Sequence, residues 1–229
     1  MRWATLQPLK FDPETDPLYF THHPNWNMPA LDIVPVGLVF RAARRGAPLP
    51  EPVIPIWELP GEADPRVPKD YLTENLVGQL HYMLGFTFEQ RDWLRARREF
   101  ERAVELSPHN DVLFYNLGLI YQRNGLLDDA VDAFERSYAI NPRHLASQGR
   151  ARAIDKLVEL RAERDRVERL VAGVAASPEM DGLPRRGAAW HERVAELLEA
   201  RGEALAARGQ RLQALQQTAS GPLSRMGEG

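Results

Sequence analysis

Few side chains in this sequence have the types and spacing that catalysis or metal binding requires. The pair His22-His23 offers two metal ligands, but a site needs three or four converging ones. The pair His191-Glu192 begins like a zinc-protease helix, but alanine stands at position 195, where that motif needs its second histidine. The pair Asp128-Asp129 lies near the start of an expected helix, where carboxylates complement the helix dipole. We therefore predict no catalytic residue, no metal site and no cofactor.

The composition of the chain excludes further classes of catalytic and binding site. The 229 residues include no cysteine, which excludes disulfides, thiolate nucleophiles and iron–sulfur clusters. Neither a glycine-rich phosphate loop nor a Gly-x-Ser-x-Gly nucleophile turn occurs. The formal net charge of -3 provides no general attraction to nucleic acid or to anionic membranes. We expect no nucleic-acid partner.

Membrane insertion by this chain is not expected either. The longest apolar run, Ile33 to Phe40, contains Pro35 and Gly37 and is far shorter than the roughly 20 residues of a membrane helix. The residues after Met1 do not have the apolar core of a signal peptide. The absence of a signal favours the cytoplasm, but the compartment remains open.

Proline divides the chain into two parts of unlike composition. Of the 18 prolines, 13 precede residue 72, so residues 1–72 cannot contain long helices. Three apolar stretches in this part, 17–21, 33–40 and 53–57, have the β-branched and aromatic content of short strands. Their internal prolines place them at sheet edges, or as extended arms on another surface. We predict an extended or partial α/β segment here.

From about Asp70 the sequence becomes helical in pattern and repeats itself. Ala96, Phe100 and Pro108 recur as Ala130, Phe134 and Pro142, each 34 residues later. Upstream of each set, Phe114, Leu117, Gly118 and Tyr121 parallel His81, Leu84, Gly85 and Phe88. Residues 145–171 and 188–217 are rich in good helix formers, while 172–187 contains Gly and Pro and is typical of a loop.

These residues resemble the tetratricopeptide repeat family. Residues 111–144 match nearly the whole family pattern, and residues 78–110 match it with His81 in the place of the usual tryptophan. The resemblance implies helical hairpins that stack into a superhelix. The residue types are consistent with such a hairpin, because Gly118 and Ala130 allow two helices to approach closely and Phe134 fills the space between them. Gly125 is suited to ending the first helix, and Pro142 stops the second.

The predicted fold is mostly α, an α-α superhelix of tetratricopeptide hairpins with a long C-terminal helical pair and an N-terminal segment of short strands. The expected divisions are 1–72 as the proline-rich segment, 73–144 as two repeats, 145–217 as a capping helical hairpin and 218–229 as a flexible tail. The capping hairpin either packs on the repeats or projects from them. The oligomeric state is open.

The resemblance implies a non-catalytic scaffold that binds a protein or peptide segment in a concave groove lined by the first helices. The matched positions are Gln79, Tyr82, Phe86, Glu89, Val112, Tyr115, Asn116, Leu119, Gln122 and Arg150. Asn116 and Arg150 fit a family pattern that grips a terminal carboxylate, but Tyr82 and Phe86 depart from it, so an aromatic and apolar groove fits better. The alternative is that the N-terminal segment covers Tyr82, Phe86 and Tyr115.

A weaker resemblance concerns the whole chain. The segments 17–21 and 35–41, followed by the repeats, are similar to the soluble tail of certain large bacterial multi-pass membrane proteins with a glycosyltransferase-like membrane portion. That resemblance implies an accessory role outside the cytoplasm, with the chemistry elsewhere and this chain a fragment of a longer protein. A third class, an enzyme in its own right, has no supporting set of residues.

Overall fold

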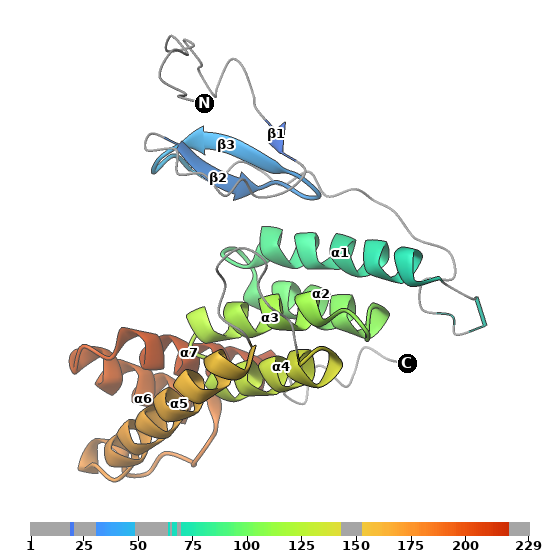
Figure 1. Cartoon of the computed structure of the whole chain (residues 1–229). Helices are drawn as coiled ribbons and strands as arrows, with labels where there is room; N and C mark the ends of the chain where they lie inside the picture. Colours follow the sequence, from blue (N-terminus) through green and yellow to red (C-terminus); the bar gives the residue numbers. More distant parts are fainter. Residues whose placement is uncertain are drawn as a thin grey trace, which may run out of the picture. The chain divides into compact units, whose positions relative to one another are not determined.

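The computed structural model describes residues 19–20, 31–48, 64, 66–67, 70–142 and 153–219. These residues form seven α-helices, one short 3-10 helix and three strands, which confirms the mostly α fold (Figure 1). The chain divides into two compact units, residues 1–106 and 107–229. The first unit contains the three strands and α1–α2, and the second contains the remaining helices.

The N-terminal strands form an antiparallel sheet with the order β1-β3-β2. The strands are β1 (Tyr19–Phe20), β2 (Leu31–Pro35) and β3 (Phe40–Arg44). The prediction of one strand over 33–40 is wrong, because the chain reverses inside it: Gly37 has φ +91° and the Val36 N–H donates to the Val39 carbonyl at 2.9 Å. Pro35 lies on the edge strand β2, as its missing N–H requires. The third predicted strand, 53–57, lies outside the described residues.

Helices α1 (Tyr71–Phe88) and α2 (Trp93–Leu106) form the first hairpin. The Asp70 carboxylate caps α1 by accepting from the Thr73 N–H at 2.7 Å. A Cβ added to Gly85 would lie 2.5 Å from the Phe100 ring, so this glycine makes room for an aromatic ring of the second helix. The hairpin therefore has the small-against-bulky packing that the repeat predicts.

The sheet of the first unit packs on α1. The Gly37 N–H donates to the Thr87 hydroxyl at 3.1 Å, and this hydroxyl lies 3.1 Å from the Gly37 carbonyl oxygen. Phe40 of β3 meets Phe86 of α1 edge to face, with ring centroids 6.2 Å apart. The β2–β3 turn is thus held on the last turns of α1.

Helices α3 (Asp111–Arg123) and α4 (Leu127–Ile140) form the second hairpin. The Leu113 N–H donates to the Asn110 side chain at 3.1 Å, which caps α3. A Cβ on Gly118 would lie 2.9 Å from the Phe134 ring. Gly125 has φ +76° in the turn, and α4 ends before Pro142. These features match the predicted roles of Gly118, Phe134, Gly125 and Pro142.

Beyond the second hairpin, the structure differs from the expected pair of long helices. It contains α5 (Ala153–Ala175), the 3-10 helix η1 (Pro178–Met180), α6 (Ala188–Ala200) and α7 (Ala204–Ala219). The stretch 188–217 breaks because Gly202 adopts φ +80° and the Glu203 N–H bonds back to the Leu198 carbonyl at 3.0 Å. Helix α6 therefore pairs with α7, and α5 packs on α4. The predicted tail begins inside α7, and residues 220–229 lie outside the described residues.

The C-terminal helices pack on the second hairpin and do not project. A Cβ on Gly209 of α7 would lie only 2.3 Å from the Gly125 carbonyl oxygen, so α7 touches the α3–α4 turn backbone to backbone. Arg166 of α5 donates two bonds to Glu163 and, at 3.0 Å, to both carboxylate oxygens of Glu203 at the α6–α7 turn. These contacts fix α5, α6 and α7 to one another and to the repeat.

Candidate functional site

The predicted groove positions of α1 are partly covered within the first unit. Tyr82 is half-buried, and its ring lies 5.9 Å from Phe86 and 5.7 Å from Phe100. Phe86 is also half-buried, because Phe40 of the sheet meets it. Gln79 is exposed and Glu89 is half-buried. The alternative that the N-terminal segment covers part of this aromatic surface therefore holds for Phe86.

On α3 the predicted positions fall into two groups. Tyr115 is 2% exposed and meets the Phe134 ring edge to face at 5.3 Å, so its side chain packs the hairpin instead of facing a partner. Val112 is 41% exposed. Asn116, Leu119 and Gln122 are partly exposed at helical spacing from Val112, so these four residues form one accessible strip on α3. Arg150 lies outside the described residues.

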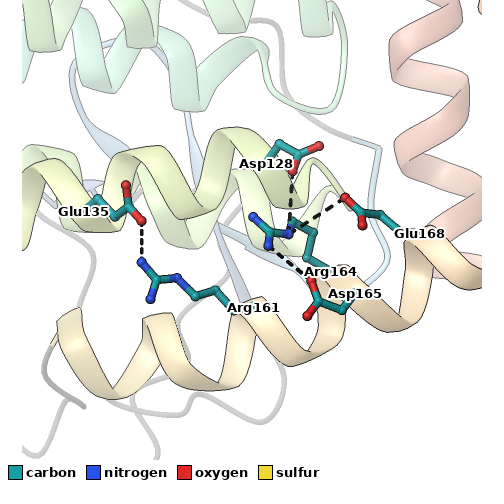
Figure 2. Close-up of polar contacts among 6 residues, drawn as sticks. All are labelled: Asp128, Glu135, Arg161, Arg164, Asp165 and Glu168. Carbon is teal, nitrogen blue, oxygen red and sulfur yellow. Dashed lines mark hydrogen bonds and ion pairs between the residues drawn. The ribbon is translucent and has the colours of Figure 1, made fainter.

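A line of ion pairs joins α4 to α5 beside this hairpin (Figure 2). Arg161 donates to Glu135 at 2.5 Å, across the two helices. Arg164 lies 3.9 Å from Asp128 of α4 and 4.0 Å from Glu168 of its own helix, and it donates to Asp165 at 3.1 Å. These neighbours raise the pKa of Arg164 above its usual value, with the Asp165 hydrogen bond as the main cause. Asp128 is thus part of a helix–helix contact.

Comparison with known proteins identifies the α3–α4 hairpin. The tetratricopeptide repeat family model matches residues 112–144, which are the α3–α4 hairpin and the residues that follow it. The chain therefore contains a tetratricopeptide repeat at these residues. A curated relative, Protein NPGR2 from Arabidopsis thaliana, is 27% identical over 85 residues, which is 36% of this chain. The chain covers only 12% of the length of that relative.

The tetratricopeptide repeat supports a role in protein–protein interaction in general terms. The family match and the relative both agree with the main resemblance drawn from the sequence. Neither of them supports the similarity to tails of membrane glycosyltransferase-like proteins. Among the described residues, the helices lack the combination of length and apolar character that crossing a membrane requires.

The ionisable residues considered above as catalytic or metal-binding candidates pack within the fold or lie at a helix start. His191 is 7% exposed, and its Nδ1 lies 2.8 Å from the Gln210 side-chain oxygen, while Glu192 is exposed. Asp128 and Asp129 fall in the first turn of α4. Across the described ranges, His, Asp and Glu side chains do not gather in groups of three or more that could hold a metal ion. The pair His22-His23 lies outside those ranges.

Sequence reasoning missed one helical hairpin beyond the tetratricopeptide repeats. The α6–α7 hairpin repeats the α3–α4 hairpin at an offset of 77 residues. Helix α6 starts at Ala188 and α3 at Asp111, while α7 starts at Ala204 and α4 at Leu127. The left-handed glycines of the two turns, Gly202 and Gly125, have the same offset. Fully buried Ala195 and Ala207 then stand where the repeat has Gly118 and Ala130. Gly202 and these small residues were the available signal.

Proposed function

We propose that this chain is a non-catalytic interaction module and that a partner protein segment binds along the accessible strip of α3. The carrying observation is that Val112, Asn116, Leu119 and Gln122 remain accessible on one face of α3, while Tyr115 between them is buried. Two apolar side chains would contact apolar groups of the partner. The two amide side chains, each with donors and an acceptor, would bond to its peptide backbone. In this proposal a few such contacts supply most of the affinity.

The predicted groove positions of α1 are not part of this proposal. Tyr82 keeps part of its ring accessible and Gln79 is exposed, but Phe86 already has Phe40 as a partner. A protein segment is favoured over nucleic acid because the chain carries a net charge of -3 and the strip on α3 has no basic side chain.

The test is to capture partners from the native organism with a photo-crosslinking side chain placed at residue 119. Val112→Arg and Asn116→Arg should each reduce the crosslinked partner at least fivefold, because a long charged side chain would occupy the strip. The matched control is Tyr138→Arg on α4, since Tyr138 is 38% exposed and Val112 is 41% exposed. Equal capture by all three variants would contradict the proposal, as would turnover by the purified chain in a hydrolase or transferase screen.

A further inference from the structure

A cavity of about 860 Å³ lies inside the second unit, between the C-terminal half of α5, the start of α6 and one face of α7. Val171 and Ala172 of α5 and Trp190 of α6 provide apolar surface. Ala172 is exposed, so the cavity opens to solvent along α5. Gln213 and Gln217 of α7 line the opposite side. None of these residues belongs to the predicted groove or to the accessible strip of α3.

The charged side chains around the cavity differ in whether they form ion pairs. Asp128 and Glu168 line it, but both lie within 4.0 Å of Arg164, which also lines it. Arg185 and Arg186, which also line it, are exposed and form no ion pair with the rest of the described chain. The two lining carboxylates therefore share one cation, whereas Arg185 and Arg186 are two cations that pair with no carboxylate among the described residues.

The start of α6 adds to this positive end. Gly187 occupies the N-cap position, so no side chain caps the helix, and the first turn contains no acidic residue. The free N–H groups and the positive end of the helix dipole lie immediately after Arg185 and Arg186 in the sequence. A carboxylate near the arginine pair would interact favourably with the guanidinium groups and with the helix start.

The backbone of Arg186 is itself unusual. Its φ is +62°, and it is the single non-glycine residue with positive φ in the described part of the chain. The left-handed conformation is unfavourable for a side chain of this size, and such residues cluster at ligand-binding sites. Glycines occupy the other left-handed positions, including Gly182 nearby. An arginine thus occupies a cavity position that glycine would occupy with less strain.

We propose that this cavity binds an extended, acidic segment of a partner protein. Apolar side chains of the segment would contact Val171, Ala172 and Trp190, and an Asp or Glu side chain would pair with Arg185 and Arg186. Gln213 and Gln217 are four residues apart on α7, which corresponds to about 6 Å along the helix. That spacing is close to the rise of about two residues of an extended peptide, roughly 6.6 Å, so the two amides can bond to peptide groups two residues apart, which face the same side.

The test uses the full chain and a display library of random heptapeptides embedded between flanking residues, so that no free carboxyl terminus is presented. Selected peptides should be enriched in Asp or Glu next to apolar residues. Ala172→Leu, which narrows the cavity at its apolar wall, and Arg185→Glu should each weaken binding of a selected, end-blocked peptide at least tenfold. Replacing its acidic residues with Gln or Asn should have the same effect.

Matched controls come from the same helix α5. Ala162→Leu and Arg169→Glu alter exposed residues outside the cavity and should leave the affinity within twofold of the wild type. Far-UV circular dichroism checks that every variant is folded. The proposal is overturned if no peptide is selected, if selected peptides lack acidic residues, or if Ala172→Leu binds as the wild type does. Peptides lost with Val112→Arg but not with Ala172→Leu would overturn this site and leave the proposed strip on α3 intact.

Discussion

In both hairpins of the second unit, α3–α4 and α6–α7, the first helix ends in the same backbone geometry. Asn124 and Arg201 have φ of -95° and -92°, and the next residues, Gly125 and Gly202, have φ of +76° and +80°. The contacts between the paired helices nevertheless differ. The repeat hairpin places the Phe134 ring over a glycine, whereas the other hairpin has alanines at the facing positions. A left-handed glycine and small facing residues are therefore what the two hairpins share.

The two hairpins also differ in the residues that they bury. The repeat hairpin fills its interior with rings such as Tyr115 and Phe134. The α6–α7 hairpin instead buries a hydrogen bond between His191 and Gln210, and both residues line the cavity. Leu127 and Asp128 of α4 also line it, so both hairpins border the proposed binding cavity.

The largest expected effect concerns the contribution of the Phe134 ring to the stability of the repeat hairpin. Phe134→Ala should lower the free energy of unfolding by about 3–5 kcal/mol, because it empties a fully buried site against Gly118 and Tyr115. Arg211, 77 residues later, is half-exposed and paired with Glu199, so Arg211→Ala should cost no more than about 1 kcal/mol. Urea denaturation followed by circular dichroism measures both. Similar losses would show that the two hairpins are stabilised in the same way.

The next prediction separates backbone strain from packing at the two turns. Gly125→Ala and Gly202→Ala both place a side chain on left-handed backbone, which costs about 1–2 kcal/mol. A Cβ at 125 would also lie 2.3 Å from the Leu205 carbonyl oxygen, whereas a Cβ at 202 meets nothing within 4 Å. Gly125→Ala should therefore destabilise by about 3 kcal/mol or more, and Gly202→Ala by strain alone. Equal unfolding midpoints for the two variants would mean that α7 does not press on the repeat turn.

The sequence allowed prediction of the repeat hairpins because their decisive contacts are local. Gly118 and Phe134 are 16 residues apart, and the contact recurs one period earlier between Gly85 and Phe100. The Asn110 cap acts within one helical turn. Short separations and a fixed period make such residues recognisable without a structure.

The remaining features depend on contacts that a local pattern does not contain. The covering of Phe86 requires Phe40, which lies in a strand 46 residues away. Burial of Tyr115 depends on which side of α3 faces α4, and a residue one position from an accessible one can be fully buried. The break at Gly202 was hidden because the alanines on both sides are good helix formers, so the local sequence favours one continuous helix.

A smaller effect concerns the ion pairs at the α6–α7 turn, where the α3–α4 turn has a buried leucine. The turn position held by buried Leu126 in α3–α4 is held by Glu203 in α6–α7, where Arg166 binds it together with Glu163. Hydrogen bonding by Arg166 lowers the pKa of Glu163 below its usual 4.5, and the charge of the guanidinium adds to the effect. A lowered carboxylate pKa contributes stability above about pH 4.5, and this contribution is lost as the pH falls through the folded-state pKa.

Arg166→Gln should therefore lower the stability at pH 7 only slightly, since Arg166 is partly exposed and solvent screens the pairs. The difference between variant and wild type should shrink as the pH falls below 4.5 and through the lowered pKa of Glu163. Thermal unfolding measured at several pH values between 3 and 8 tests this. The neighbouring exchange Arg169→Gln, at an exposed residue of α5, is the control and should show no such dependence. A stability difference that persists unchanged at pH 3 would contradict the assignment.

The smallest expected effect has the opposite sign and links the unusual loop to the cavity. Arg186→Gly relieves a left-handed residue, so it should raise the free energy of unfolding by about 0.5–1 kcal/mol after the added freedom of the unfolded chain is counted. Arg185→Gly removes the same charge from a residue with negative φ and should lower stability instead. Both variants should weaken binding of an acidic peptide, because each removes one cation from the cavity. If Arg186→Gly is stabilised and still binds the peptide fully, the strain at residue 186 does not serve the cavity, and another cause must keep arginine there.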